Sequence, residues 1–157
     1  MIQYYAMKNF CRILSKSIST VFFIGYVPFA PGTFGSLAAM LFVWTFKPDI
    51  AWQAIILIFC FIIGVKSAHI TEQELGGKDN QCIVIDEFVG YLVSIFLLPL
   101  NFGYIISAFF LFRFFDILKP PPIRNMEKWL CGGMGIMIDD VAAGIFSNII
   151  LQVWRLI

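Results

Sequence analysis

Residues 83–116 read IVIDEFVGYLVSIFLLPLNFGYIISAFFLFRFFD, and the path of this stretch through a membrane decides the topology of the fold. Its middle part, residues 88–112, carries no charged side chain. As one span it would put Asp86 and Asp116 on opposite membrane faces, and as a hairpin it puts them on the same face. The proline and glycine in Pro99-Leu100-Asn101-Phe102-Gly103 favour a turn. We therefore predict a helical hairpin with arms of about 15 residues, roughly 22 Å each.

The composition of the chain is that of a membrane protein. Of its 157 residues, 60% are hydrophobic, 17% aromatic and 13% charged, against about 25% charged in ordinary soluble domains. A soluble protein of this composition would leave large apolar patches in water. The net charge of +1 leaves no basic face for nucleic acid as a partner. We expect one membrane-embedded domain over residues 1–157, whose oligomeric state the sequence leaves open.

Three further stretches carry no charge, namely residues 17–46, 50–65 and 141–154. Prolines and glycines between residues 28 and 35 indicate that the first stretch is broken. We expect a re-entrant piece to about Ala30, then a helix from about Gly35 to Phe46. The second stretch is shorter than the roughly 20 residues of a membrane span, so its helix should either continue through Lys66 or thin the bilayer. The predicted fold class is an all-α, compact integral-membrane helical bundle.

The basic residues indicate the orientation of this bundle. With the hairpin formed and the N-terminus inside, only Lys47 and Arg155 of the eleven Lys and Arg lie outside. The polar motifs then gather at the cytoplasmic interface: PGTFGS (31–36), KDNQCIVIDE (78–87), RFFDILKPPPIR (113–124) and GGMGIMIDD (132–140).

Four carboxylates stand inside apolar stretches, as the pairs Asp86–Glu87 and Asp139–Asp140. An ionised carboxylate near hydrocarbon costs several kcal/mol, so such residues usually face a partner, a metal or a wet cavity. Their hard oxygen atoms suit magnesium. The alternative for Asp139 and Asp140 is a position in the first turn of a helix, where free amides and the helix dipole favour Asp.

Arg113, Asp116 and Lys119 share one helix face that ends at three prolines. Asp116 is a candidate metal ligand or base, and Lys119 and Arg124 could clamp a phosphate from both sides of the proline turn. The alternatives are an intrahelical Arg113–Asp116 ion pair and anchoring of the basic residues to anionic lipid.

The PGTFGS motif could present backbone amides and the hydroxyl of Thr33 to an anion at a helix start. Alternatively, Thr33 or Ser36 merely caps the helix. His69 is the only histidine, and we interpret it as a structural residue at the membrane interface rather than a catalytic one.

Four motifs in register resemble the phosphatidylglycerophosphatase A family of bacterial membrane lipid phosphatases. These motifs are PGTFGSLAA (31–39), IVIDEFVG (83–90), FRFFDILKPPPIR (112–124) and GGMGIMIDDVAAG (132–144). The resemblance covers roughly residues 25 to 146. It implies magnesium-dependent hydrolysis of the terminal phosphate of phosphatidylglycerophosphate, giving phosphatidylglycerol and inorganic phosphate at the inner membrane.

We therefore expect a multi-pass enzyme of the bacterial inner membrane whose active site faces the cytoplasm. Asp86, Glu87, Asp139 and Asp140 would hold Mg2+, and water would attack the phosphomonoester directly. A phospho-aspartate route stays open, although no DxDx[TV] motif is present. The competing class is a small transporter or channel that uses the carboxylates as a cation site. A structural membrane subunit would leave the acids unexplained.

Overall fold

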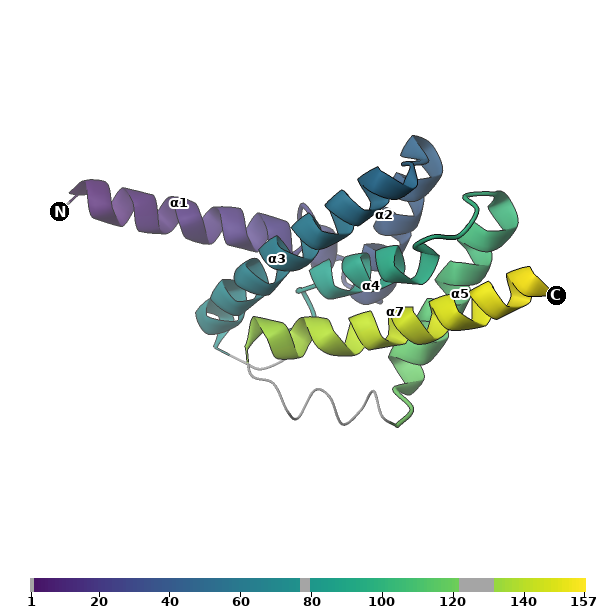
Figure 1. Ribbon diagram of the computed structural model, residues 1–157. Helices are drawn as coiled ribbons and strands as arrows, with labels where there is room; N and C mark the ends of the chain where they lie inside the picture. Colours follow the sequence, from purple (N-terminus) through teal and green to yellow (C-terminus); the bar gives the residue numbers. More distant parts are fainter. Residues whose placement is uncertain (1, 77–79, 122–131) are drawn as a thin grey trace.

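The computed structural model describes residues 2–76, 80–121 and 132–157, and the side chains from residue 7 onward within them. All elements in these ranges are helices, which confirms the predicted all-α class: α1 (Ile2–Ser19), the 3-10 helix η1 (Ile24–Tyr26), α2 (Pro31–Phe46), α3 (Ile50–Leu75), α4 (Ile85–Ile95), α5 (Phe102–Leu118) and α7 (Gly133–Leu156). Figure 1 shows α1 projecting away from a bundle formed by the other helices.

The predicted hairpin is present as α4 and α5, and its arms have 11 and 17 residues rather than about 15 each. Helix α4 ends early because Pro99 disfavours helical backbone before it, and Leu97 adopts a left-handed φ of 61°. Helix α5 starts at Phe102 and is capped by Asn101, whose side chain accepts a hydrogen bond from the Tyr104 amide at 3.1 Å.

The first uncharged stretch is broken as predicted, but α2 begins at Pro31 and not near Gly35. Proline suits the first helical position because its missing N–H would have no partner there. Before α2, the residues Val21 to Phe23 all have positive φ and turn the chain between α1 and η1. The depth of this segment in a bilayer stays a prediction.

Helix α3 continues through Lys66 to Leu75, which is the first of the two alternatives for the short apolar stretch. Its 26 residues and the 24 of α7 correspond to about 39 and 36 Å. Within the described ranges, these two helices are long and apolar enough to cross a membrane.

Helix α4 lies at the centre, in contact with α2, α3, α5 and α7. Its Val89 and Tyr91 are fully buried, and the Tyr91 hydroxyl donates to the Ile105 carbonyl of α5 at 3.1 Å. Glycines let α4 and α7 approach closely: a Cβ at Gly144 would overlap the carbonyl oxygen of Gly90. Small residues at such contacts are typical of membrane helix pairs.

Candidate active site

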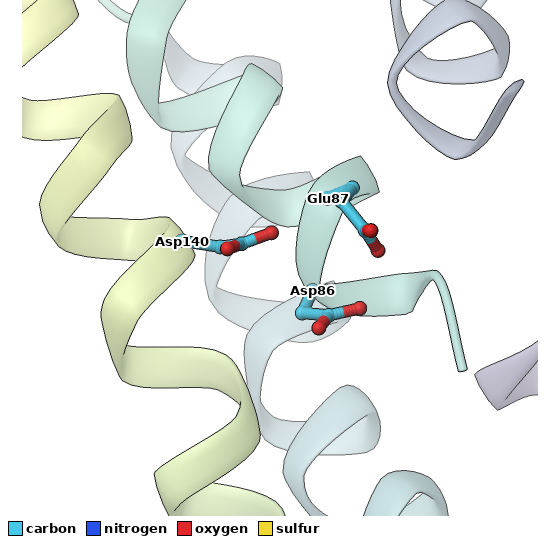
Figure 2. A group of neighbouring side chains, drawn as sticks. All are labelled: Asp86, Glu87 and Asp140. Atoms are coloured by element: carbon cyan, nitrogen blue, oxygen red, sulfur yellow. The ribbon is translucent and has the colours of Figure 1, made fainter. Parts of the chain in front are cut away.

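Three acidic side chains from two helices meet beside the start of α4. Asp86 and Glu87 lie in its first turn, and Asp140 reaches them from α7. Figure 2 shows the Asp140 carboxylate pointing toward this turn. One carboxylate oxygen from each residue lies within 4.8 Å of the other two. The close α4–α7 contact accounts for this meeting, because a Cβ at Gly90 would come within 2.8 Å of the Asp140 carbonyl oxygen.

Several oxygen atoms of this acidic group have no partner. Asp86 Oδ1, Glu87 Oε2 and Asp140 Oδ2 are buried without a hydrogen bond from any described residue. Buried carboxylates that repel one another and lack donors are costly unless a cation joins them. A hard divalent cation with oxygen ligands fits this donor set.

Asp139 was predicted to hold metal with its neighbour, but its carboxylate forms an ion pair with Lys119. Adjacent residues on a helix point about 100° apart, so Asp139 and Asp140 face different partners. Partial burial acts to lower the pKa of Lys119, but the hydrogen bond and charge of Asp139 outweigh it, so the pKa is raised. Lys119 is therefore a cation at any physiological pH.

Asp116 forms the predicted intrahelical ion pair with Arg113, and both side chains are largely buried. The Asp116 carboxylate also lies close enough to Glu87 and Asp140 to interact with their charges. Asp116 thus lies next to the acidic group, and its ion pair with Arg113 holds that side chain there.

A polar cavity of about 560 Å3 opens beside the acidic group. Its walls contain two carboxylates, two cations, two amides and part of the α2 start: Asp86, Glu87, Arg113, Lys119, Asn80, Gln81, Ala30, Pro31, Gly32, Ile83 and Ile136. Carboxylates and cationic side chains, the kinds of group that can bind a metal ion and a phosphate, thus face a single cavity.

Sequence reasoning treated Arg113 only as an ion-pair partner and missed it as a cavity residue. Its Nη1 would lie 3.3 Å from a Cβ at Gly32, which shows how closely α2 faces it. The RFFD motif could have indicated this role, because Arg113 and Asp116 share a helix face, so a site that contains Asp116 also contains Arg113.

Thr33 does not line the cavity, although the start of α2 does. Its amide bonds to the Ala30 carbonyl at 3.0 Å, and the Ser36 hydroxyl bonds to the Gly32 carbonyl at 2.9 Å. Neither side chain caps α2, because the residue before the helix is Ala30. The backbone of Pro31 and Gly32, rather than the Thr33 hydroxyl, borders the cavity.

The cap alternative for Asp139 and Asp140 is wrong, because α7 begins at Gly133 and has no acid in its first turn. Asp86 and Glu87 do lie in a first turn, where the dipole of α4 favours negative charge.

His69 is exposed and bonds to Gln73 on its own helix. The predicted clamp residue Arg124 lies outside the described residues.

Comparison with known proteins agrees with these motifs. The family model described as Phosphatidylglycerophosphatase A matches residues 17–155. A phosphatidylglycerophosphatase A of Escherichia coli is 41% identical over 81% of this chain and 75% of its own length. One from Haemophilus influenzae is 42% identical over 84% of this chain and 85% of its own.

A third relative, from Bacteroides thetaiotaomicron, is named as a candidate phosphatidylinositol-3-phosphatase and is 39% identical over 88% of this chain and 91% of its own. No solved structure gives a significant match. The match of the family model to nearly the whole chain, with two relatives of the same name, shows that the chain belongs to the phosphatidylglycerophosphatase A family of phosphatases.

Proposed function

We propose that this enzyme removes the terminal phosphate of phosphatidylglycerophosphate, in a magnesium-dependent reaction at the cytoplasmic face of the bacterial inner membrane. The names of two relatives support the substrate. The observation that carries the proposal is a single cavity in which unpartnered acidic oxygens face Arg113 and Lys119.

The two cations would bind the phosphate group. Arg113 offers a planar fork for two phosphate oxygens, and Lys119 offers a point charge. Asp116 and Asp139 would hold these side chains in place through their ion pairs. Positive charge fixed before the reaction stabilises the charge that gathers on the equatorial oxygens as the P–O bond breaks.

Asp86, Glu87 and Asp140 would hold the magnesium ion. When bound, the ion would screen the charge of the phosphate and lower the pKa of a water molecule that attacks it. Asp139, whose Oδ1 is also buried without a hydrogen-bond partner among the described residues, would add a fourth carboxylate to this ligand set while its Oδ2 holds Lys119.

Two alternatives give different results in one assay. The Bacteroides relative suggests a phosphoinositide headgroup, so phosphatidylinositol 3-phosphate should be offered beside phosphatidylglycerophosphate. The channel alternative predicts cation flux in vesicles without phosphate release. We expect the purified enzyme to release phosphate from phosphatidylglycerophosphate, to stop on chelation and to recover with magnesium. Full activity in excess chelator would contradict the metal assignment.

Asp86→Asn and Asp140→Asn should each lower turnover by more than ~100-fold, because each change removes a charge that the ion needs. Their melting temperatures without metal should hold or rise, since repulsion among the carboxylates is relieved. Asp49→Asn is the matched control. Asp49 caps α3 at the other end of the bundle, and Asn caps as well as Asp. Near-normal turnover of both site variants would remove these residues from the site.

A further inference from the structure

A second large hollow takes no part in the site described above. Its volume is about 540 Å3, within the roughly 300–1,000 Å3 of ligand sites. Every residue that lines it is apolar or a cysteine, and we call it the apolar groove. Helices α2, α3 and α4 contribute Ala38, Phe42, Cys60, Ile63, Ile85 and Phe88 to its walls.

The apolar groove is open to the surface of the molecule. Two of its lining side chains, Phe22 and Phe59, are 79% and 62% exposed. On α3 it lies within the uncharged stretch 50–65, which is the part of that helix suited to hydrocarbon. Protein interiors rarely keep empty space of this size, because the lining atoms lose their packing contacts. An apolar group that enters sideways from a bilayer would fill this space.

The first turn of α4 separates the apolar groove from the polar cavity. Ile85 and Phe88, three residues apart, face the groove, whereas Asp86 and Glu87 face the cavity. Helix α2 repeats this division, with Gly32 at the cavity and Ala38 and Phe42 at the groove. One molecule with an anionic end and an alkyl end would match both hollows.

The path between the two hollows is short enough for a phospholipid. Ile24 lines the groove and Ala30 lines the cavity, so their Cα atoms lie at most about 20 Å apart. A phospholipid occupies half of a bilayer about 40–45 Å thick, or roughly 20 Å. The connecting residues Pro28 and Phe29 are exposed, so the glycerol part can cross over them.

We propose that the apolar groove binds an acyl chain of the lipid whose phosphate occupies the polar cavity. This inference rests on the proposed function, since the phosphate end must be substrate. Chain binding there holds the headgroup at the acidic group and makes hydrolysis depend on acyl chain length.

The test compares two phosphatidylglycerophosphates, one with long acyl chains and one with six-carbon chains, each below its micellar concentration or at matched dilution in detergent. Ala38→Phe fills the groove from α2. Ala51→Phe is the control, because it makes the same change at an exposed position of α3 that does not line the groove. We expect Ala38→Phe to lower kcat/KM for the long-chain substrate roughly tenfold and for the short-chain substrate less than about twofold.

Each outcome separates the two proposals. If the unmodified enzyme hydrolyses neither lipid, the proposed function fails. If it hydrolyses both and Ala38→Phe affects them equally, the groove inference fails while the function stands. The unmodified enzyme should also prefer the long-chain lipid, and equal kcat/KM for both would overturn the inference.

Photolabelling of the unmodified enzyme covers the case in which Ala38→Phe does not fold. The probe is a phosphatidylglycerophosphate with a diazirine midway along one chain. Its label should map to the groove residues Cys60 and Ile63, and excess unlabelled long-chain substrate should prevent it. Equal labelling of Ile58 and Ile62, which face outward on the same helix, would mean a bulk lipid position and would overturn the inference.

Discussion

At the scale of single residues, Gly32 sets the position of the Glu87 carboxylate. A Cβ added at Gly32 would overlap Glu87 Oε1 and come within 3.3 Å of Arg113 Nη1. The atom that must give way is the end of a flexible side chain, so the fold need not shift. Glu87 would instead leave the acidic group.

We therefore predict that Gly32→Ala lowers turnover at least ~10-fold while its melting temperature hardly changes. Replacing glycine by alanine within a helix contributes about 0.5–1 kcal/mol of stability, which offsets the displacement of one side chain. The control is Gly103→Ala in the first turn of α5, where the new Cβ meets nothing closer than 3.5 Å. Phosphate release and thermal unfolding in detergent check both variants. Unaltered turnover of Gly32→Ala would contradict the role of Glu87.

The sequence alone singled out the Asp86–Glu87 and Asp139–Asp140 pairs, because charge inside an apolar stretch is costly in any fold, and the structure brings Asp86, Glu87 and Asp140 together. It did not predict that Asp139 turns to Lys119 while Asp140 turns to α4. That difference depends on the rotation of α7 about its axis, which the Gly90–Gly144 contact determines. The roles of Arg113 and of the α2 backbone likewise depend on contacts between helices far apart in the chain.

At the scale of elements, the end of α4 is held by polar side chains from its neighbours. Asn148 of α7 donates to the carbonyls of Ser94 and Phe96 at 3.1 and 2.8 Å. Arg155 donates to the Leu97 carbonyl at 3.2 Å. A helix that ends inside an apolar bundle leaves carbonyls without partners, and these bonds satisfy them.

We predict that Asn148→Leu lowers the free energy of unfolding by about 1–3 kcal/mol, because the Ser94 carbonyl loses its side-chain donor and the Phe96 carbonyl keeps only the long bond from Gln152. Turnover per folded molecule should stay near normal, since Asp86 lies eight helical residues, about 12 Å, from Ser94. Gln152→Leu is the control, because its bond to the Phe96 carbonyl is only 3.5 Å long. Denaturation in detergent measures both, and equal stability of the two variants would contradict the prediction.

The sequence predicted the helix break near Pro99, which follows from local backbone rules, and one of its two alternatives for α3 was the continuation through Lys66 that the structure has. It misplaced the start of α2 because it weighed Gly35 as a helix breaker. In the structure Gly35 lies inside the helix, where a Cβ would come within 2.9 Å of Val84. Tight packing between helices, not local propensity, accounts for that glycine.

At the scale of the whole molecule, the two ends of the bundle differ in character. Trp44, Trp52 and Trp154 are exposed at one end, where Trp44 packs against Phe102 and Trp154 against Tyr104. The acidic group and its two cations lie at the other end. Tryptophan and tyrosine favour the boundary between hydrocarbon and water, so we expect the aromatic end to lie at one membrane surface.

We predict that this aromatic end faces the periplasm. In a variant without the native cysteines, Gly103→Cys at that end should react with a membrane-impermeant thiol reagent in intact cells. Gln81→Cys, at the mouth of the polar cavity, should react only after the inner membrane is opened. Labelling of both from outside would contradict the hairpin topology, and the reverse pattern would invert the orientation.

Helix α7 supplies both Asp140 and Asn148, and it is the last helix of the chain to be synthesised. The completion of the acidic group therefore depends on the order of synthesis. The ribosome makes α4 and α5 before α7, so the acidic group does not exist while those two helices enter the membrane. Helix α4, with 11 residues or about 17 Å, is too short to cross a bilayer core of about 30 Å alone. Before α7 is made, the chain lacks Asp140 and Asn148, so we expect neither a complete acidic group nor a satisfied end of α4 at that stage. A nascent chain would acquire hydrolytic activity only once it is fully inserted.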